Sequence, residues 1–231
     1  MTKYTDMWDI IEDRYKDEYG PSIEEYKQSV NMRELVMIGR AGYGMWQGGE
    51  LLCRALMSAG KSGKVIFVMP GERQNSPTRS FVRYADVPVT FPGSHIYKPD
   101  HMIISDIDLL EFQSLVFDID TTAFTRRMDE KGLVILDSPM SPDQIKTKTP
   151  LKPKLVTVDA TQIALDILEA VFHRNTALIG AYLAVTKVMP LESFEKAILE
   201  YKDPRGRLVY SGKKGELNIK AARAGYESVK M

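Results

Sequence analysis

The chain of 231 residues is poor in cysteine and histidine and carries no excess charge of either sign. Its single cysteine, Cys53, excludes an internal disulfide and fits a reducing compartment. The balance of 31 basic against 31 acidic residues argues against a nucleic-acid protein and against a polybasic membrane binder. The nearest candidate for a membrane span, residues 177–189, is interrupted by Lys187 and falls short of the roughly 18 apolar residues required. We therefore expect a cytoplasmic protein that binds neither nucleic acid nor membrane.

Charge is nevertheless distributed unevenly along the chain. Residues 1–30 carry eight acidic and four basic side chains, whereas residues 201–231 carry eight basic and three acidic ones. Two such ends can pair with each other, dock on a partner or face solvent. Apolar side chains in the first segment recur at helical intervals, and Gly20-Pro21 predicts the end of that helix. We divide the chain into a helical N-terminal arm (1–30), a main domain (31–200) and a basic C-terminal segment (201–231).

The main domain alternates short apolar runs with amphipathic stretches. Buried strands are predicted at residues 34–38, 64–69, 79–84, 102–104, 133–136 and 155–158. Helices are predicted at residues 45–59, 121–130, 161–172, 176–188 and 191–201. The first strand, helix and second strand form a βαβ unit, which predicts parallel strands with a right-handed crossover. We expect a three-layer α/β fold with a Rossmann-like start, a mostly parallel sheet and helices on both faces.

The most specific local feature is the glycine-rich turn GRAGYG at residues 39–44, between the first predicted strand and the first predicted helix. Such a turn directs backbone N–H groups and the positive end of the helix dipole at an anion, typically a phosphate. A turn that only lets strand and helix pack closely has the same composition, so both interpretations stay open. An NAD site is disfavoured, because the first acid after the second strand, Glu72, lies beyond a proline.

No catalytic constellation stands out in the sequence. The three histidines lie at no recurring metal-ligand spacing from other ligating residues. The pairs Ser105-Asp106 and Asp137-Ser138 follow predicted strands, but neither lies in a G-x-S-x-G elbow. We therefore assign no catalytic and no metal-binding residue to this chain.

A second unusual segment follows the second strand and contains Arg73, Arg79 and Arg83. Arg79 and Arg83 share one predicted strand face around Phe81, and two guanidinium groups so placed suit a phosphate or a carboxylate. Taken alone, the pattern slightly favours an edge strand with solvated charges.

Three separated motifs together resemble a known family. They are residues 39–52, which combine GRAGYG with GELL, residues 72–89 (ERQNSPTRSFVRYADVPV), and residues 159–181, which contain DAT and NTALIGA. In this order they resemble the gamma subunit of the 2-oxoacid:ferredoxin oxidoreductases, such as pyruvate:ferredoxin oxidoreductase. Ala41, Tyr43 and Asn75 depart from the family's Gly, Gln and Gly, and the N-terminal arm is extra. The resemblance is therefore to a divergent member.

The resemblance implies a multi-subunit enzyme that converts a 2-oxoacid and coenzyme A to acyl-CoA, CO2 and a reduced acceptor. Alpha, beta and delta-type subunits would hold thiamine diphosphate, magnesium and [4Fe-4S] clusters, and ferredoxin or another acceptor would receive the electrons. The gamma subunit would help to assemble the complex and to position coenzyme A, with no catalytic centre of its own.

The candidates for contact with coenzyme A are the glycine turn and the arginines of the following segment: Gly39, Arg40, Gly42, Tyr43, Gly44, Arg73, Arg79 and Arg83. Tyr43 would either stack on the adenine or fill the space of the family's glutamine. Two alternatives remain open: a purely structural subunit without coenzyme A binding, and a stand-alone nucleotide-binding α/β protein.

Overall fold

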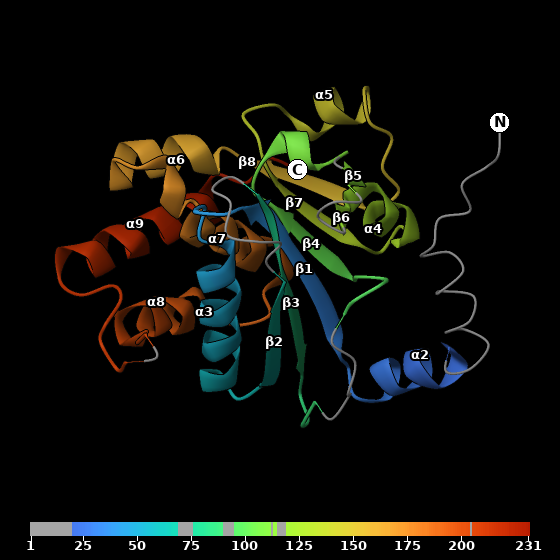
Figure 1. Cartoon of the computed structure of the whole chain (residues 1–231), viewed down its shortest axis with the longest axis horizontal. Helices are drawn as coiled ribbons and strands as arrows, with labels where there is room; N and C mark the ends of the chain where they lie inside the picture. The colour runs from blue at the N-terminus through green and yellow to red at the C-terminus, as the bar shows by residue number, and fades with distance from the viewer. Residues whose placement is uncertain (1–19, 69–75, 90–94, 112, 115–118, 204) are drawn as a thin grey trace.

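A six-stranded mixed sheet forms the centre of the protein, as the computed structural model shows (Figure 1). The structure describes residues 20–68, 76–89, 95–111, 113–114, 119–203 and 205–231. The strands of the main sheet are β1 (Arg33–Arg40), β2 (Ser62–Val68), β3 (Pro77–Ala85), β4 (His101–Ile104), β7 (Leu133–Asp137) and β8 (Lys154–Val158). Two further short strands, β5 (Gln113–Ser114) and β6 (Ile119–Asp120), form a separate pair.

The strand order is β2-β3-β1-β4-β7-β8, and the neighbours from β1 to β8 are parallel. Strand β3 runs antiparallel between β1 and β2. The predicted βαβ unit therefore has parallel strands, but β3 separates them instead of letting them pair. The expectation of an edge strand with solvated charges is wrong, because Arg79 and Arg83 lie on an interior strand and are only 3% and 2% exposed.

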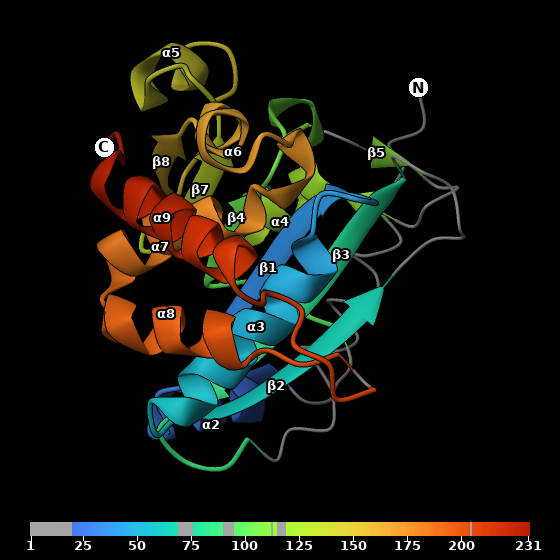
Figure 2. The ribbon, with the colours of Figure 1, turned by 90° about the vertical axis from the view of Figure 1, so that its left-hand side faces the viewer.

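Helices cover both faces of the sheet, so the predicted three-layer α/β fold is confirmed. One face carries α3 (Met45–Ser58), α6 (Ala160–Leu168), α7 (Asn175–Thr186), α8 (Leu191–Glu200) and α9 (Lys213–Glu227), which lie in front of the strands in Figure 2. The other face carries the 3-10 turn η1 (Ile107–Leu109), α4 (Thr121–Arg127) and α5 (Pro142–Lys146). The helix predicted at residues 161–172 is divided, because α6 ends at Leu168 and a second 3-10 turn, η2 (Val171–His173), follows.

Side chains along each strand point alternately to the two faces of the sheet and fill a hydrophobic core on each face. Leu35 and Met37 of β1 face the larger core under α3 and α7, whereas Val36 and Ile38 face the core under α4. Because the β1, β4 and β7 side chains on both faces are buried, these strands read as continuous apolar runs. This burial explains why the sequence pattern locates them within two residues of their observed ends.

The basic residues 201–231 are continuous with the main fold. Helix α9 packs on α7 so closely that a Cβ on Gly180 would lie 2.0 Å from the Ala222 carbonyl oxygen. Near the chain end, Lys230 and Thr157 of β8 exchange backbone hydrogen bonds of 2.8 and 3.0 Å. The sequence pattern does not predict α9, since its glycines and lysines weaken the apolar stripe.

At the other end of the chain, residues 1–19 lie outside the described part, so most of the predicted arm is not seen. The described helix α2 (Gly20–Ser29) begins at Gly20-Pro21, the dipeptide predicted to end the helix of the arm. Proline is compatible with a first helical turn, since its missing N–H has no intrahelical partner there. Lys27 of α2 donates to Glu34 at the start of β1 (3.0 Å). Within the described residues, no helix is long and apolar enough to cross a membrane.

Candidate functional site

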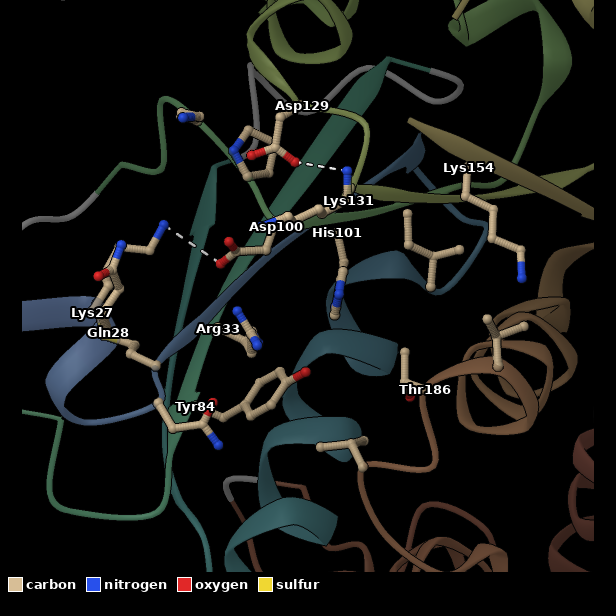
Figure 3. A pocket seen from close by; sticks show the side chains of 18 of the residues that line it. Lys27, Gln28, Arg33, Tyr84, Asp100, His101, Asp129, Lys131, Lys154 and Thr186 are labelled. Carbon is tan, nitrogen blue, oxygen red and sulfur yellow. Dashed lines mark hydrogen bonds and ion pairs between the residues drawn. The ribbon is translucent and has the colours of Figure 1, made fainter. Parts of the chain in front are cut away.

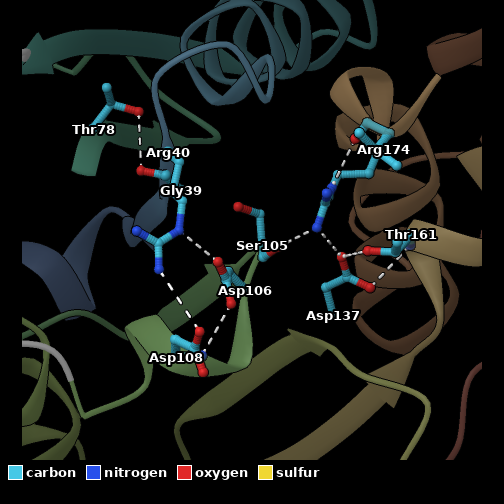
Figure 4. Close-up of polar contacts among 10 residues, drawn as sticks. Gly39, Arg40, Thr78, Ser105, Asp106, Asp108, Asp137, Thr161 and Arg174 are labelled. Atoms are coloured by element: carbon cyan, nitrogen blue, oxygen red, sulfur yellow. Dashed lines mark hydrogen bonds and ion pairs between the residues drawn. The ribbon is translucent and has the colours of Figure 1, made fainter. Parts of the chain in front are cut away.

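The carboxyl ends of β1 and β4 form a topological switch point. After β1 the chain passes to α3 on one face of the sheet, whereas after β4 it passes through η1 to the other face. Ligands of open α/β sheets bind in the crevice at such points. We call this region the carboxyl edge and define it by residues 39–44, 79, 105–108, 137 and 174–175; Figure 4 shows part of it.

The glycine turn presents backbone donors at the carboxyl edge. Gly42 and Gly44 have φ values of +98° and +76°, a conformation that glycine adopts without strain. In the described chain, neither of their N–H groups donates to a backbone acceptor, and α3 begins at Met45 without a side-chain cap. Ala41 lies outside the left-handed region and donates to the Ser76 carbonyl (2.7 Å), so alanine is compatible with this position. The turn therefore keeps the N–H groups that suit an anion.

A buried hydroxyl lies next to the turn. The Ser105 Oγ is buried and has no hydrogen-bond partner among the described residues. It lies 2.5 Å from the place that a Cβ on Gly39 would take, so any larger residue at position 39 would displace it. A polar group of this kind is usually satisfied by a partner, and its presence fits a region that receives a polar ligand.

Arg40 points from the turn toward acidic residues that follow β4. Its Nε donates to Asp106 Oδ2 at 2.6 Å, and its Nη2 lies 3.9 Å from Asp108 Oδ2 (Figure 4). The hydrogen bond to Asp106 raises the pKa of Arg40 further. The Arg40 side chain is 24% exposed and can be reached from solvent, but its charge is already partly balanced.

A buried ion pair supports the turn from below. Arg174, which precedes α7, donates through Nη1 to Asp137 Oδ2 (2.9 Å) and to the Ser105 carbonyl (3.0 Å). Asp137 also accepts from the Thr161 N–H (3.0 Å) and hydroxyl (2.7 Å). Burial raises the pKa of Asp137 in spite of these favourable partners. The Arg174 guanidinium lies 4.2 Å from the centroid of the Tyr43 ring, which fixes the ring on that side.

The structure brings only some of the predicted residues together. Arg79 pairs in register with Ile38 and so lies at the carboxyl edge, buried, with its guanidinium 5.8 Å from the Phe81 ring centroid. Arg83 pairs in register with Glu34 at the opposite end of β1 and donates to its carboxylate (2.8 Å). Four residues along a strand span roughly 13 Å, so Arg83 does not reach the turn. Arg73 lies outside the described residues.

Sequence reasoning misses several members of the carboxyl edge. Asp106 and Asp137 belong to two strand-end pairs for which the sequence supports no hydrolase role. Their position at the carboxyl ends of neighbouring strands is the signal that unites them. Asn175, whose Nδ2 donates to the Gly44 carbonyl (3.1 Å), opens a segment quoted only for the family resemblance. Arg174 carries no sequence signal. Among the described residues, no three His, Cys, Asp or Glu side chains gather as a metal site.

The fold defines a doubly wound α/β protein whose topological switch point lies at the carboxyl edge. Residues 34–228 match the family described as pyruvate ferredoxin/flavodoxin oxidoreductase, and the chain belongs to this family. The resemblance deduced from the three motifs is thereby confirmed.

Relatives with almost the same extent are subunits of such enzymes. The chain is 34% identical to the common gamma subunit of the pyruvate/ketoisovalerate oxidoreductases of Thermococcus litoralis, over 85% of this chain and 96% of that one. The crystal structure of the pyruvate oxidoreductase subunit PORC of Thermotoga maritima superposes with a TM-score of 0.69 at 28% identity, covering 86% and 97%. The 2-oxoglutarate:ferredoxin oxidoreductase of Magnetococcus marinus, solved with 2-oxoglutarate, coenzyme A and succinyl-CoA, shares the fold (TM-score 0.63, 14% identity, 84% of this chain and 30% of that one).

Proposed function

We propose that the chain is the gamma subunit of a 2-oxoacid:ferredoxin oxidoreductase complex and that its carboxyl edge holds the phosphates of coenzyme A. The complex would contain alpha, beta and delta-type subunits with thiamine diphosphate, magnesium and [4Fe-4S] clusters, and ferredoxin would accept the electrons. Coenzyme A, when bound, supplies the thiol that takes the acyl group. The observation that carries this proposal is the glycine turn, whose N–H groups are open at the switch point beside the orphaned Ser105 hydroxyl.

The charges of the carboxyl edge set a condition on binding. Arg40, Arg79 and Arg174 bring three positive charges, and Asp106, Asp108 and Asp137 bring three negative ones. Arg174 forms a buried ion pair with Asp137. A phosphate therefore gains most from the backbone donors and from Arg40, provided that the Arg40 guanidinium turns from Asp106 to the ligand. The two carboxylates that follow β4 would then accept hydrogen bonds from ligand hydroxyl groups.

Tyr43 is placed to contact the base of such a ligand. Its ring lies against Arg174 on one side and is 6.1 Å from the Phe172 ring, while the residue remains partly exposed. An aromatic ring that is already fixed loses little conformational entropy when an adenine stacks on it. Support also comes from a protein of the same fold that was solved with coenzyme A.

Two substitutions with opposite expected effects test this role. In the assembled complex, Arg40→Gln should raise the KM for coenzyme A about tenfold, since a charge-assisted hydrogen bond is lost. Asp106→Asn should lower that KM several-fold, because it removes the anion that competes for Arg40. Decarboxylation measured with an artificial acceptor should be nearly unchanged in both, because the thiamine cofactor lies in other subunits.

The control is Arg223→Gln, which breaks an exposed ion pair between α9 and Glu195 of α8, outside the carboxyl edge, and should leave the KM unchanged. If neither Arg40→Gln nor Asp106→Asn moves the KM, the turn does not hold coenzyme A. The alternative of a purely structural subunit would then be preferred.

A further inference from the structure

A large pocket lies at the opposite edge of the sheet, where β1, β4, β7 and β8 begin (Figure 3). Its volume is about 920 Å³, within the range of small-molecule sites. Residues from α2, the starts of these strands and the end of α7 line it. We call it the amino-edge pocket. The pocket and the glycine turn lie at opposite ends of β1, whose length is roughly 23 Å, so the two sites are distinct.

The lining of the amino-edge pocket is strongly basic. It contains seven Lys or Arg side chains and two acidic ones. Lys27 and Lys61 pair with Glu34 and Asp86. No ion pair to a carboxylate of the described chain is formed by four other cations of the lining: Arg33, Lys98, Lys131 and Lys154. Such a surplus of positive charge in a concavity favours an anion.

The two acidic residues of the lining are already engaged. Asp100 accepts from the Glu34 N–H at 2.8 Å and lies 3.5 Å from the Lys27 ammonium. Asp129 accepts from the Lys131 N–H at 2.9 Å, in the turn that precedes β7. Both carboxylates therefore serve the local backbone and leave the surplus cations uncompensated.

Two neutral polar side chains of the lining, Tyr84 and His101, are joined through a third side chain buried behind the pocket. The buried Tyr182 hydroxyl is 2.7 Å from the Tyr84 hydroxyl and 2.8 Å from His101 Nδ1. Burial lowers the pKa of His101 to about 4; Asp100 opposes this shift and Arg33 adds to it, so the imidazole is neutral at pH 7. In either direction of this chain of hydrogen bonds, one donor of the lining remains for an oxygen-rich anion, either the Tyr84 O–H or the His101 Nε2–H.

We propose that the amino-edge pocket binds a small molecule with at least two phosphate groups. Cations on several separate segments surround the pocket, so a single charge would leave most of them unpaired. Lysine and arginine both bind phosphate oxygens through charge-assisted hydrogen bonds. The site is independent of the proposed coenzyme A site and would give the subunit a second ligand, remote from the turn.

The test uses pyrophosphate and two histidines that report on opposite edges. His101 lines the amino-edge pocket, whereas His173 precedes Arg174 at the carboxyl edge. In the full-length chain at low ionic strength, pyrophosphate should shift the His101 imidazole NMR resonance saturably. The double variant Arg33→Gln/Lys131→Gln should raise the Kd at least tenfold. The control variant Lys220→Gln, which removes an exposed lysine of α9 outside the pocket, should leave the Kd unchanged.

Equilibrium dialysis of the assembled complex with labelled pyrophosphate and saturating coenzyme A separates this site from the carboxyl edge. Binding that persists under coenzyme A and is lost in the double variant supports the proposal. The proposal is overturned if coenzyme A displaces the label, if the double variant and Lys220→Gln behave alike, or if pyrophosphate moves only the His173 resonance. It is also overturned if His101 responds only to added partner subunits, since the pocket would then receive an acidic protein segment.

Discussion

The two edges of the central sheet are built from the same strands but treat charge in different ways. At the carboxyl edge, Arg40 and Arg174 lie against the carboxylates of Asp106 and Asp137. At the amino edge, the side-chain charges of Arg33 and Lys131 form no ion pair with a carboxylate of the described chain. Buried ion pairs stabilise both edges, since Glu34 accepts from Lys27 and Arg83 at the start of β1, but the amino edge also keeps a surplus of positive charge around a cavity.

This difference separates structural charge from charge that is open to a ligand. A buried, paired charge is costly to remove one side at a time, because the remaining partner is left desolvated. An exposed or cavity-lining cation costs little to remove, because water already solvates it. Stability measurements on variants of the two edges should therefore diverge even where both variants remove one charge.

The largest effect is expected at the buried pair of the carboxyl edge. Asp137→Ala leaves Arg174 buried and without its carboxylate, so the free energy of unfolding should fall by about 3 kcal/mol. Arg33→Gln at the amino edge should change it by less than about 0.5 kcal/mol. Urea denaturation of the two variants measures both values. Similar losses of unfolding free energy in the two variants would contradict the distinction between buried, paired charge and charge that is open to a ligand.

A smaller effect is expected from pH at the amino-edge pocket. Burial lowers the pKa of His101 from 6.5 to about 4, so between these values the unfolded chain binds the proton more tightly than the folded chain does. His101 therefore stabilises the fold fully above pH 6.5, and this contribution is lost as the pH falls toward 4. We expect a loss of about 2 kcal/mol, which allows for its partial exposure.

The variant His101→Gln isolates the contribution of His101 protonation to the pH dependence of stability. The free energy of unfolding, measured by urea denaturation at pH 7 and at pH 4.5, should fall less in His101→Gln than in the unmodified chain. His173→Gln serves as the comparison variant. Burial also lowers the pKa of His173, but His173 is less buried, so this variant should change the pH dependence less than His101→Gln does. Equal pH dependence in the unmodified chain and in His101→Gln would show that the histidine titrates normally.

Much of the fold is predictable because burial on both faces leaves a continuous apolar run in β1, β4 and β7. The place of β3 is not predictable from local pattern, since only its long-range pairing with β1 and β2 puts Arg79 and Arg83 inside the protein. The burial of both arginines depends on this tertiary pairing, which the spacing of residues in the sequence does not predict.

The candidate sites divide in the same way. The glycine turn is local, so its sequence predicts both its conformation and its open N–H groups. The pairing of Arg174 with Asp137 joins residues 37 positions apart, and the amino-edge pocket joins α2 to the starts of four strands. Such groupings depend on the order of the strands in the sheet, which local sequence patterns do not determine.

The smallest expected effect compares two glycines of the turn. Both Gly42→Ala and Gly44→Ala place a Cβ at positive φ, which costs about 1 kcal/mol each. A Cβ at position 44 would also lie 3.0 Å from Asn175 Cγ, whereas at position 42 its nearest neighbour is Phe172 at 3.9 Å. Gly44→Ala should therefore lose about 1 kcal/mol more than Gly42→Ala in urea denaturation.

The same pair separates packing from binding at the carboxyl edge. Gly42 is exposed and has few neighbours, so Gly42→Ala should cost little stability. If Gly42→Ala nevertheless raises the KM for coenzyme A, the phosphates bind at the turn. Gly44→Ala moves the start of α3 and should raise the KM as well, because the first-turn N–H groups shift with it. If only Gly44→Ala raised the KM, the helix start alone would hold the ligand. An unchanged KM in both variants would leave the turn the role of packing β1 against α3.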